Sequence, residues 1–335
     1  MKIQNKSQES SQSLAKIEGW QRILQRSPKA TRNTAERFRI PQKWLQTSPS
    51  RLPFQLNEYW AGLIQSANDP IGTQTLPSEE ELFITPGNWP DPLQEEKHRK
   101  ASLIIHRYQD RVLFLVSNTC PVYCRFCTRR RLVGKPPFPT RDQMSQSFNY
   151  LQNHPEIREV ILSGGDPLIL SDQRLGWILE NLQAIEHVKI IRVGTRAPVT
   201  LPQRITESLI ALLKNFSPLY ILTQFNHPRE ITEESREACA RLTNAGIPIL
   251  NQSVLLRGVN DDPEIMLKLM QTLIEIRVIP YYLHQLDPVQ GAHHFEVSIE
   301  KGREIIRYLR EHSGGIAVPA YVFDDPEAPS KVPLA

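Results

Sequence analysis

The amino-acid sequence predicts an α/β fold, a partial (βα)6 TIM-like barrel, because short apolar segments alternate with amphipathic ones along most of its length. From residue 110 onward this alternation occurs six times. The apolar segments are nearly continuous, which is typical of parallel strands covered by helices. Strands are predicted at 112–117, 159–163, 189–194, 219–225, 247–255 and 279–286, and helices near 141–153, 173–184, 204–214, 232–245, 263–276 and 298–311.

A second observation supports the barrel: polar residues follow or line the end of every predicted strand. In a parallel barrel the carboxyl ends of the strands meet on one face, where barrel enzymes build their active sites. We therefore expect one active site there. The positions are three cysteines after the first strand, Ser163 to Asp166 after the second, Thr195 and Arg196 after the third, Asn226 and His227 after the fourth, Asn251 and Gln252 along the fifth, and Asp287 after the sixth.

The chain before the barrel is predicted to be mainly helical. Residues 1–16 are rich in Ser, Gln and Lys and are expected to form a disordered tail. Residues 17–68 carry apolar side chains at helical spacing, broken by prolines, and 69–100 form a Pro-rich connector. We divide the chain into this 17–100 segment, a 101–320 barrel and a 321–335 C-terminal segment, and expect 17–100 to cover the core without contributing chemistry.

Composition indicates a soluble globular protein rather than a nucleic-acid or membrane protein. The chain has 335 residues, of which 40% are hydrophobic and 23% charged, and its net charge is only +4. The sequence contains no apolar run of membrane-spanning length, and its N-terminus has no apolar signal region. We therefore expect no nucleic-acid partner, no membrane and a cytoplasmic location.

Three of the four cysteines, Cys120, Cys124 and Cys127, lie on one predicted loop with the spacing C-x3-C-x2-C. An odd number of neighbours this close does not suit disulfides, and a structural zinc site needs a fourth ligand that this stretch lacks. Three soft thiolates suit an iron–sulfur cluster with one iron left open. The alternative, cysteines as small core residues, explains Cys239 better than it explains the triplet.

The string CPVYCRFCTRRRLVG resembles the lysine 2,3-aminomutase family of the radical S-adenosylmethionine (SAM) superfamily, over roughly residues 80–335. The resemblance implies a six-stranded partial radical SAM barrel. It also implies three cofactors: a [4Fe–4S] cluster on the cysteine triplet, SAM and pyridoxal 5'-phosphate (PLP). Moving an amino group between unactivated carbons requires radical chemistry that no side chain supplies.

On the SAM side, the resemblance assigns Gly164, Gly165 and Asp166 to the amino group of SAM and Phe126 to its adenine. Gly-Gly and Asp-Pro are also ordinary turn formers, and Phe126 also suits plain packing. On the PLP side, the resemblance assigns Arg107, Tyr108 and Arg111, and His227 and Gln252 match positions that line the cofactors in the family. The polar run 106–111 equally suits a solvated strand edge, and a lone histidine such as His227 is more often structural.

Lys331 matches the family lysine that binds PLP covalently, and Arg129 matches the arginine that binds the substrate carboxylate. Asp287 and Asp324 match two aspartates that hold the distal ammonium of lysine; singly, either suits a turn or a helix cap. The chain departs from the family between Asp324 and Lys331, where DPEAPS replaces a glycine-rich run at unchanged spacing.

These residues predict an isomerase that converts L-lysine to β-lysine, supplied with electrons by a donor such as flavodoxin or ferredoxin. Two alternatives stay open. The same chemistry serves the β-lysylation of elongation factor P in short bacterial relatives. The altered loop before Lys331 also suits a degenerate member that binds cluster or SAM without PLP catalysis. Assembly into a homo-oligomer is left open by the sequence.

Overall fold

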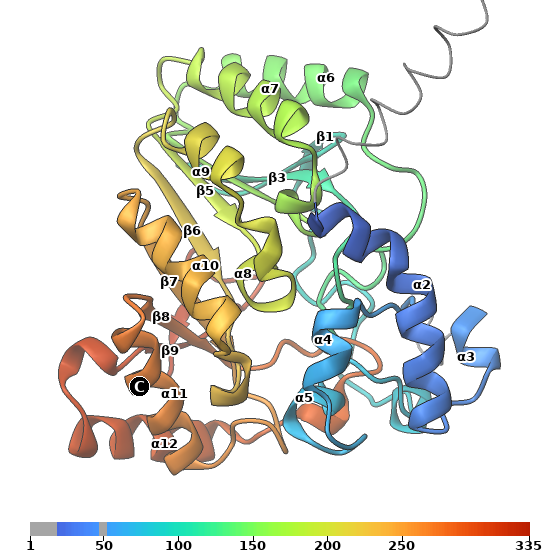
Figure 1. Cartoon of the computed structure of the whole chain (residues 1–335). Helices are drawn as coiled ribbons and strands as arrows, with labels where there is room; N and C mark the ends of the chain where they lie inside the picture. The colour runs from blue at the N-terminus through green and yellow to red at the C-terminus, as the bar shows by residue number, and fades with distance from the viewer. Residues whose placement is uncertain (1–18, 47–51) are drawn as a thin grey trace, which may run out of the picture.

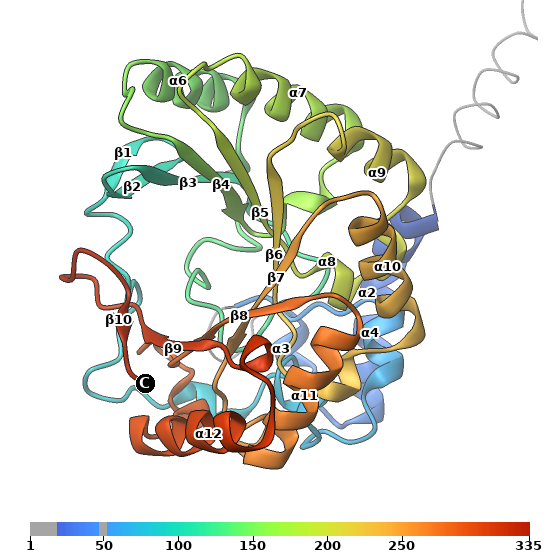
Figure 2. The ribbon, with the colours of Figure 1, turned by 90° about the vertical axis from the view of Figure 1, so that its left-hand side faces the viewer.

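A computed structural model describes residues 19–46 and 52–335, and the predicted tail 1–16 lies outside them. Its centre is a ten-stranded sheet with the strands in chain order from β1 to β10. The sheet curves in an arc, and the long helices lie on its outer side (Figures 1 and 2). No helix in the described part of the chain is long and apolar enough to cross a membrane.

The six predicted strands form the parallel centre of this sheet, which confirms the α/β partial barrel. They are β3 (Arg111–Ser117), β4 (Glu159–Gly164), β5 (Ile190–Gly194), β6 (Leu219–Thr223), β7 (Ile249–Val254) and β8 (Ile279–His284). The predicted helices are α6 (Arg141–Gln152), α7 (Asp172–Gln183), α9 (Glu207–Leu213), α10 (Glu233–Asn244), α11 (Pro263–Glu275) and α12 (Ile299–His312). Each begins after a side chain that caps it: Thr140, Ser171, Thr206, Thr232, Asp262 and Ser298.

Four further strands extend the sheet beyond the six that were predicted. At one edge, β1 (Arg99–Ala101) and β2 (Ile104–Tyr108) pair antiparallel with each other and β2 with β3. At the other edge, β9 (Ala320–Phe323) runs parallel to β8, and β10 (Val332–Pro333) runs antiparallel to β9. These strands are only two to five residues long, so pairing with a neighbour defines them rather than a periodic apolar pattern.

Short helices connect these elements. Within the barrel they are η2 (Pro167–Ile169), α8 (Ala197–Thr200), η3 (Pro202–Arg204), η4 (Pro228–Glu230), η5 (His293–Phe295) and η6 (Gly315–Ala317). The N-terminal part contains α2 (Gly19–Arg37), α3 (Lys43–Gln46), α4 (Glu58–Leu63), α5 (Pro70–Thr73) and η1 (Glu79–Leu82), which agrees with the prediction that this part is mainly helical.

The N-terminal part packs against the loops at the carboxyl ends of the strands. The Asn57 side chain donates a hydrogen bond to the Thr200 carbonyl at 2.8 Å, and the Trp89 amide donates one to the Pro288 carbonyl at 2.7 Å. The main hydrophobic core includes buried residues of both parts, among them Trp60 and Phe114. The expectation that 17–100 only covers the core is therefore incomplete, because this segment touches the active-site face. We propose that the barrel extends from about residue 101 to about residue 320.

Candidate active site

A cavity of about 630 Å³ lies within the arc of the sheet and collects nearly all of the predicted site residues. Its wall comes from widely separated parts of the chain, because the ends of successive strands converge there. The predicted residues that line it are Arg107, Tyr108, Arg111, Cys120, Cys124, Phe126, Cys127, Arg129, Gly164, Gly165, Asp166, Gln252, Asp287, Asp324 and Lys331.

His227 is the predicted site residue that does not line this cavity. Its ring Nδ1 accepts a hydrogen bond from the Arg229 amide at 3.1 Å and caps the short helix η4. Burial, together with the nearby Arg229 guanidinium, lowers the pKa of His227 to about 4. The structure therefore gives this histidine a local structural contact, in line with the alternative weighed for a lone histidine.

The three cysteines of the triplet are free thiols on the loop that follows β3, and all three line the cavity. Burial raises the pKa of Cys120 well above its usual value and that of Cys127 to about 11. Because metals bind the thiolate, loading this site must release protons. Cys239 is instead fully buried on α10.

The donor set of three soft thiols on one loop fits an iron–sulfur cluster, in which each thiolate binds its own iron. Within residues 19–46 and 52–335, no group of three His, Cys, Asp or Glu side chains is arranged to hold a single metal ion.

The turn formed by Gly164, Gly165 and Asp166 packs directly on the cysteine loop. The Gly165 amide donates to the Ser117 carbonyl at 2.7 Å, and the Asp166 amide donates to the Thr119 carbonyl at 2.8 Å. A side chain at position 165 would place its Cβ 2.6 Å from the Thr119 nitrogen. The glycine is therefore required for the approach of one loop to the other, whatever ligand the turn also contacts.

The Asp166 carboxylate accepts three hydrogen bonds from the protein itself. Its donors are the Leu168 amide at 3.0 Å, the Thr195 hydroxyl at 2.6 Å and the Arg196 amide at 2.9 Å. Burial raises the pKa of Asp166. The carboxylate thus connects the loops that follow β4 and β5. Its contact with the amino group of SAM stays a prediction.

Arg129 faces the cavity, and the acidic segment before β1 holds it there. Its Nε donates to Glu95 Oε1 at 2.7 Å, and its Nη1 donates to Ser163 Oγ at 3.1 Å. The neighbouring Arg131 forms ion pairs with Asp91 at 3.1 Å and with Glu95 at 3.3 Å. Sequence analysis missed Glu95, although an acidic run facing three consecutive arginines is a signal of charge complementarity.

At the far edge of the sheet, Asp324 connects the C-terminal hairpin to β2. It forms an ion pair with Lys331, accepts a hydrogen bond from Arg107 Nη1 at 2.7 Å and lies 3.2 Å from the Tyr108 hydroxyl. Burial alone would raise the pKa of Asp324, but the Lys331 ammonium and the Arg107 guanidinium hold it below its usual value. Asp324 is therefore an ionised carboxylate at neutral pH.

Arg107 also donates hydrogen bonds to loop 324–331, which replaces the family's glycine-rich run. It donates to the Asp325 carbonyl and, at 3.3 Å, to the Ala328 carbonyl. The resemblance assigns this arginine to PLP, whereas in the structure most of its donors serve loop 324–331. Arg111, stacked 4.0 Å from the Tyr108 ring centroid, and Arg192 are the other arginines at this end of the cavity. Arg192 was not among the predicted site residues.

Asp287 lies partly buried in the cavity wall, and one of its oxygens lacks a protein partner among the described residues. Within the described part of the chain, its buried Oδ1 has no hydrogen-bond donor. Burial, reinforced by the Asp324 carboxylate, raises the pKa of Asp287 to about 7. Such an orphaned buried carboxylate marks a place where a ligand supplies the missing cation.

Most of the chain is similar in sequence to known proteins. Residues 114–270 match the model of the radical SAM superfamily. The chain is 46% identical over 294 residues to an L-lysine 2,3-aminomutase of Methanococcus maripaludis, covering 87% of this chain and 68% of the relative. It is 41% identical to a glutamate 2,3-aminomutase of Clostridioides difficile, covering 88% of this chain and 70% of the relative.

A solved radical SAM methyltransferase from Sphaerobacter thermophilus has the same fold, with a TM-score of 0.50 at 20% identity over 66% of this chain and 68% of that chain. Radical SAM proteins carry a [4Fe–4S] cluster and SAM, which agrees with the thiols found in the cavity. The expectation of a radical SAM enzyme is thereby confirmed. The chain belongs to the lysine 2,3-aminomutase family of the radical SAM superfamily.

Proposed function

We propose that this protein is a PLP-dependent radical SAM aminomutase that converts L-lysine to β-lysine by moving an amino group from C2 to C3. One observation carries the proposal. A single cavity holds three thiols, a cation at Arg129 and two aspartates, Asp287 and Asp324, beside a lysine. The relatives named above act on lysine or on glutamate, so the choice of substrate depends on these charged side chains.

The two carboxylates favour lysine over glutamate. The α-carboxylate of the substrate would pair with Arg129, whose planar guanidinium suits a carboxylate. The side-chain ammonium would supply the missing partner of Asp287 and reach Asp324 as well. A glutamate side chain would instead place a third carboxylate among two others, which costs free energy because like charges repel in a desolvated site.

Lys331 fits a role in holding PLP. It lines the cavity with its ammonium 5.8 Å from the Tyr282 ring centroid, and two arginines, Arg111 and Arg192, lie in the same wall to receive a phosphate. The ion pair of Lys331 with Asp324 holds the side chain at the wall of the cavity.

The cofactors, when bound, supply a radical that removes hydrogen from C3 and a carbonyl group that carries the migrating nitrogen. The chain contributes a fixed position for both ends of lysine and a buried cavity that shields reactive species from water. Electrons for the cluster would come from a flavodoxin or ferredoxin. The thiolates of Cys120, Cys124 and Cys127 would bind three irons and leave the fourth open to SAM.

The test is an anaerobic assay of reconstituted protein with SAM, PLP, a one-electron reductant and either lysine or glutamate. We expect β-lysine from lysine and little turnover of glutamate. Cys124→Ala should lose cluster absorbance and SAM cleavage, whereas Cys239→Ala, at a buried site on α10, should keep both. Equal turnover of glutamate would contradict the assignment of the two aspartates.

PLP attachment is tested separately by reduction with borohydride and peptide mapping. We expect the label on Lys331 and its loss in Lys331→Ala. A protein that cleaves SAM but carries no label would instead be the degenerate family member that the proline-bearing loop 324–331 suggests.

A further inference from the structure

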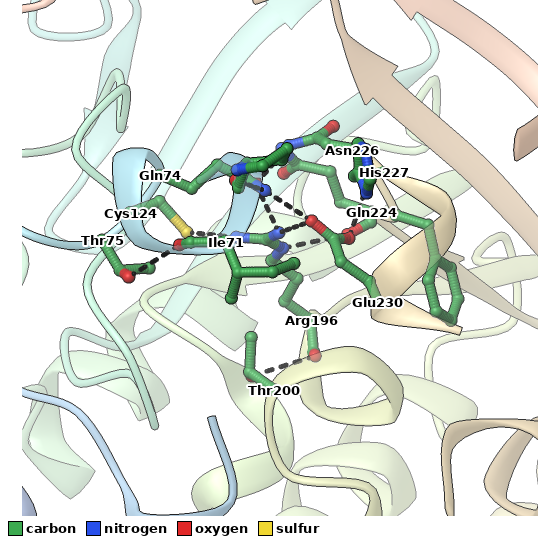
Figure 3. Close-up of polar contacts among 12 residues, drawn as sticks. Ile71, Gln74, Thr75, Cys124, Arg196, Thr200, Gln224, Asn226, His227 and Glu230 are labelled. Atoms are coloured by element: carbon green, nitrogen blue, oxygen red, sulfur yellow. Dashed lines mark hydrogen bonds and ion pairs between the residues drawn. The ribbon is translucent and has the colours of Figure 1, made fainter. Parts of the chain in front are cut away.

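Arg196, the residue that follows Thr195 after β5, donates a hydrogen bond to one of the three cluster cysteines. Its Nη1 lies 2.8 Å from the Sγ of Cys124 (Figure 3). The other two cysteines of the triplet lie on the same loop, but Cys124 is the one that this guanidinium reaches. Sequence analysis noted Arg196 only for its place at the end of a strand.

Buried partners hold the Arg196 guanidinium in one orientation. Its Nε donates to the Gln224 carbonyl at 2.9 Å, and its Nη2 donates to Gln74 Oε1 at 2.8 Å and to Glu230 Oε1 at 3.1 Å (Figure 3). The Trp60 and Phe126 rings lie 5.2 and 5.8 Å from its central carbon. With donors committed in three directions, the group has little freedom to move.

Its partners are themselves connected. Gln74 Nε2 donates to Glu230 Oε1 at 2.6 Å, and the Asn226 amide donates to Glu230 Oε2 at 2.8 Å. The side chains of Gln74, Asn226 and Glu230 are fully buried, with relative exposures of 0%. A fully satisfied polar network of this kind is rigid, and it joins the N-terminal segment to the ends of β5 and β6.

We propose that Arg196 is a positioning residue for the cluster: it orients Cys124 and raises the reduction potential of the [4Fe–4S] centre, with Glu230 as the opposing charge. Reduction adds one electron to the cluster and therefore adds negative charge. A hydrogen bond to a ligand sulfur and a nearby fixed cation both favour the more negative state. Arg196 supplies both the hydrogen bond and the positive charge, and the negative charge of the Glu230 carboxylate partly cancels the effect of that positive charge.

This inference rests on the part of the proposed function that places the cluster on the cysteine triplet, and not on lysine as substrate. It also implies that the N-terminal segment influences the cluster, because Gln74 of that segment and Glu230 both accept hydrogen bonds from Arg196 Nη2. The two charges predict opposite effects: loss of the arginine lowers the potential, and loss of the carboxylate alone raises it. Damage to the fold would not produce opposite shifts.

The experiment is a spectroscopic redox titration of anaerobically reconstituted protein, with iron content and the thermal midpoint measured alongside. Four variants are compared with the wild type. Arg196→Lys keeps the charge, Arg196→Met with Glu230→Gln removes both charges and the donor, and Glu230→Gln removes only the carboxylate. Arg204→Lys is the matched control, because Arg204 is also buried and ion-paired, with Asp172 at 2.6 Å. Its Nε and Nη2 donate to the carbonyls of Leu168 and Leu170 rather than to a cysteine.

We expect a more negative midpoint potential and faster cluster loss in the Arg196→Met/Glu230→Gln protein, and a more positive potential in Glu230→Gln. A tenfold change in the one-electron equilibrium corresponds to about 59 mV. Arg196→Lys should fall between the double variant and the wild type, and Arg204→Lys should match the wild type in potential. If the double variant fails to fold, the positive shift in Glu230→Gln still decides the question.

Unchanged or negatively shifted potential in Glu230→Gln, or unchanged potential in a folded double variant, would overturn the proposal. A wild-type protein that binds no cluster would overturn both this inference and the proposed function. If the wild type holds the cluster and the variants show these shifts, but the wild type turns over no lysine, only the proposed substrate is contradicted.

Discussion

At the scale of single residues, the two aspartates of the cavity differ because their surroundings differ. Asp324 has the Lys331 ammonium and the Arg107 guanidinium beside it, which keep its pKa low despite burial. Burial raises the pKa of Asp287 to about 7, and one of its oxygens has no donor in the described part of the chain. Two carboxylates that titrate far apart are suited to different tasks in one site.

The first prediction concerns pH. Asp287 binds an ammonium only as the carboxylate, so the free protein should bind lysine better as the pH rises through about 7. We expect kcat/KM for lysine to rise with pH in this range, because kcat/KM reports groups of the free enzyme. The residual kcat/KM of Asp287→Asn should not rise with pH in this range. If the rise persists in that variant, another group causes it.

The second prediction concerns Asp324, which contacts both the hairpin and, by our proposal, the substrate. Asp324→Asn removes a charged partner, which costs about 1.5–3 kcal/mol, or roughly 10- to 150-fold in KM for lysine. It also releases Lys331 from its ion pair, so PLP labelling of Lys331 should change. Kinetics and borohydride labelling measure the two effects. An unchanged KM for lysine would show that the substrate ammonium binds elsewhere.

At the scale of elements, the approach of the β4–η2 turn to the cysteine loop determines the shape of the site. Gly164 has a φ of 109°, a conformation that other residues rarely adopt, and Gly165 lies against the backbone of Thr119. Backbone hydrogen bonds from Gly165 and Asp166 then hold the cysteine loop in place. The position of the thiols therefore depends on two glycines, whatever ligand their backbone also contacts.

The third prediction is that Gly165→Ala destabilises the cysteine loop. The new Cβ would lie 2.6 Å from the Thr119 nitrogen and 2.8 Å from the Asn118 carbonyl carbon, and backbone atoms cannot swing aside as a side chain can. Overpacking of this kind costs about 1–3 kcal/mol. We expect lower iron content and a lower thermal midpoint. Gly314→Ala is the control, since a Cβ there meets nothing within 4 Å; equal behaviour of the two variants would refute the steric argument.

At the scale of the whole molecule, the N-terminal segment and the barrel build the site together. Arg125, between two cavity-lining residues of the cysteine loop, forms an ion pair with Glu81 in which both side chains are 0% exposed. Its Nε donates to Glu81 Oε1 at 2.8 Å, and its amide donates to the Gln74 carbonyl at 2.8 Å. The segment before the barrel thus fixes the backbone of the loop that carries the cysteines.

The fourth prediction tests this connection. Glu81→Gln leaves the Arg125 charge buried without its ionic partner, which costs about 3–5 kcal/mol of unfolding free energy because a desolvated charge loses its compensation. Chemical denaturation of the protein measures this loss. Glu79→Gln changes an exposed neighbour in the same short helix and should have little effect. Similar stability of the two variants would mean that the buried ion pair contributes little.

Sequence patterns alone predict the six βα units and place most of the candidate site residues at the ends of strands. Apolar periodicity is a local property, so the strands and helices of the barrel were predicted to within a few residues. The carboxyl ends of parallel strands must converge, so polar residues such as Arg129 and Asp287, scattered along the chain, were expected in one cavity. The motif resemblance then supplied the family.

The pairs of polar groups that meet follow from the three-dimensional fold. The edge strands β1, β2, β9 and β10 exist through pairing with neighbours, which no local pattern encodes. Arg107 serves the C-terminal loop, Glu95 orients Arg129, and Arg196 reaches Cys124 across 72 positions of the chain. These contacts satisfy buried donors and charges, and their partners follow from three-dimensional packing rather than from spacing along the sequence.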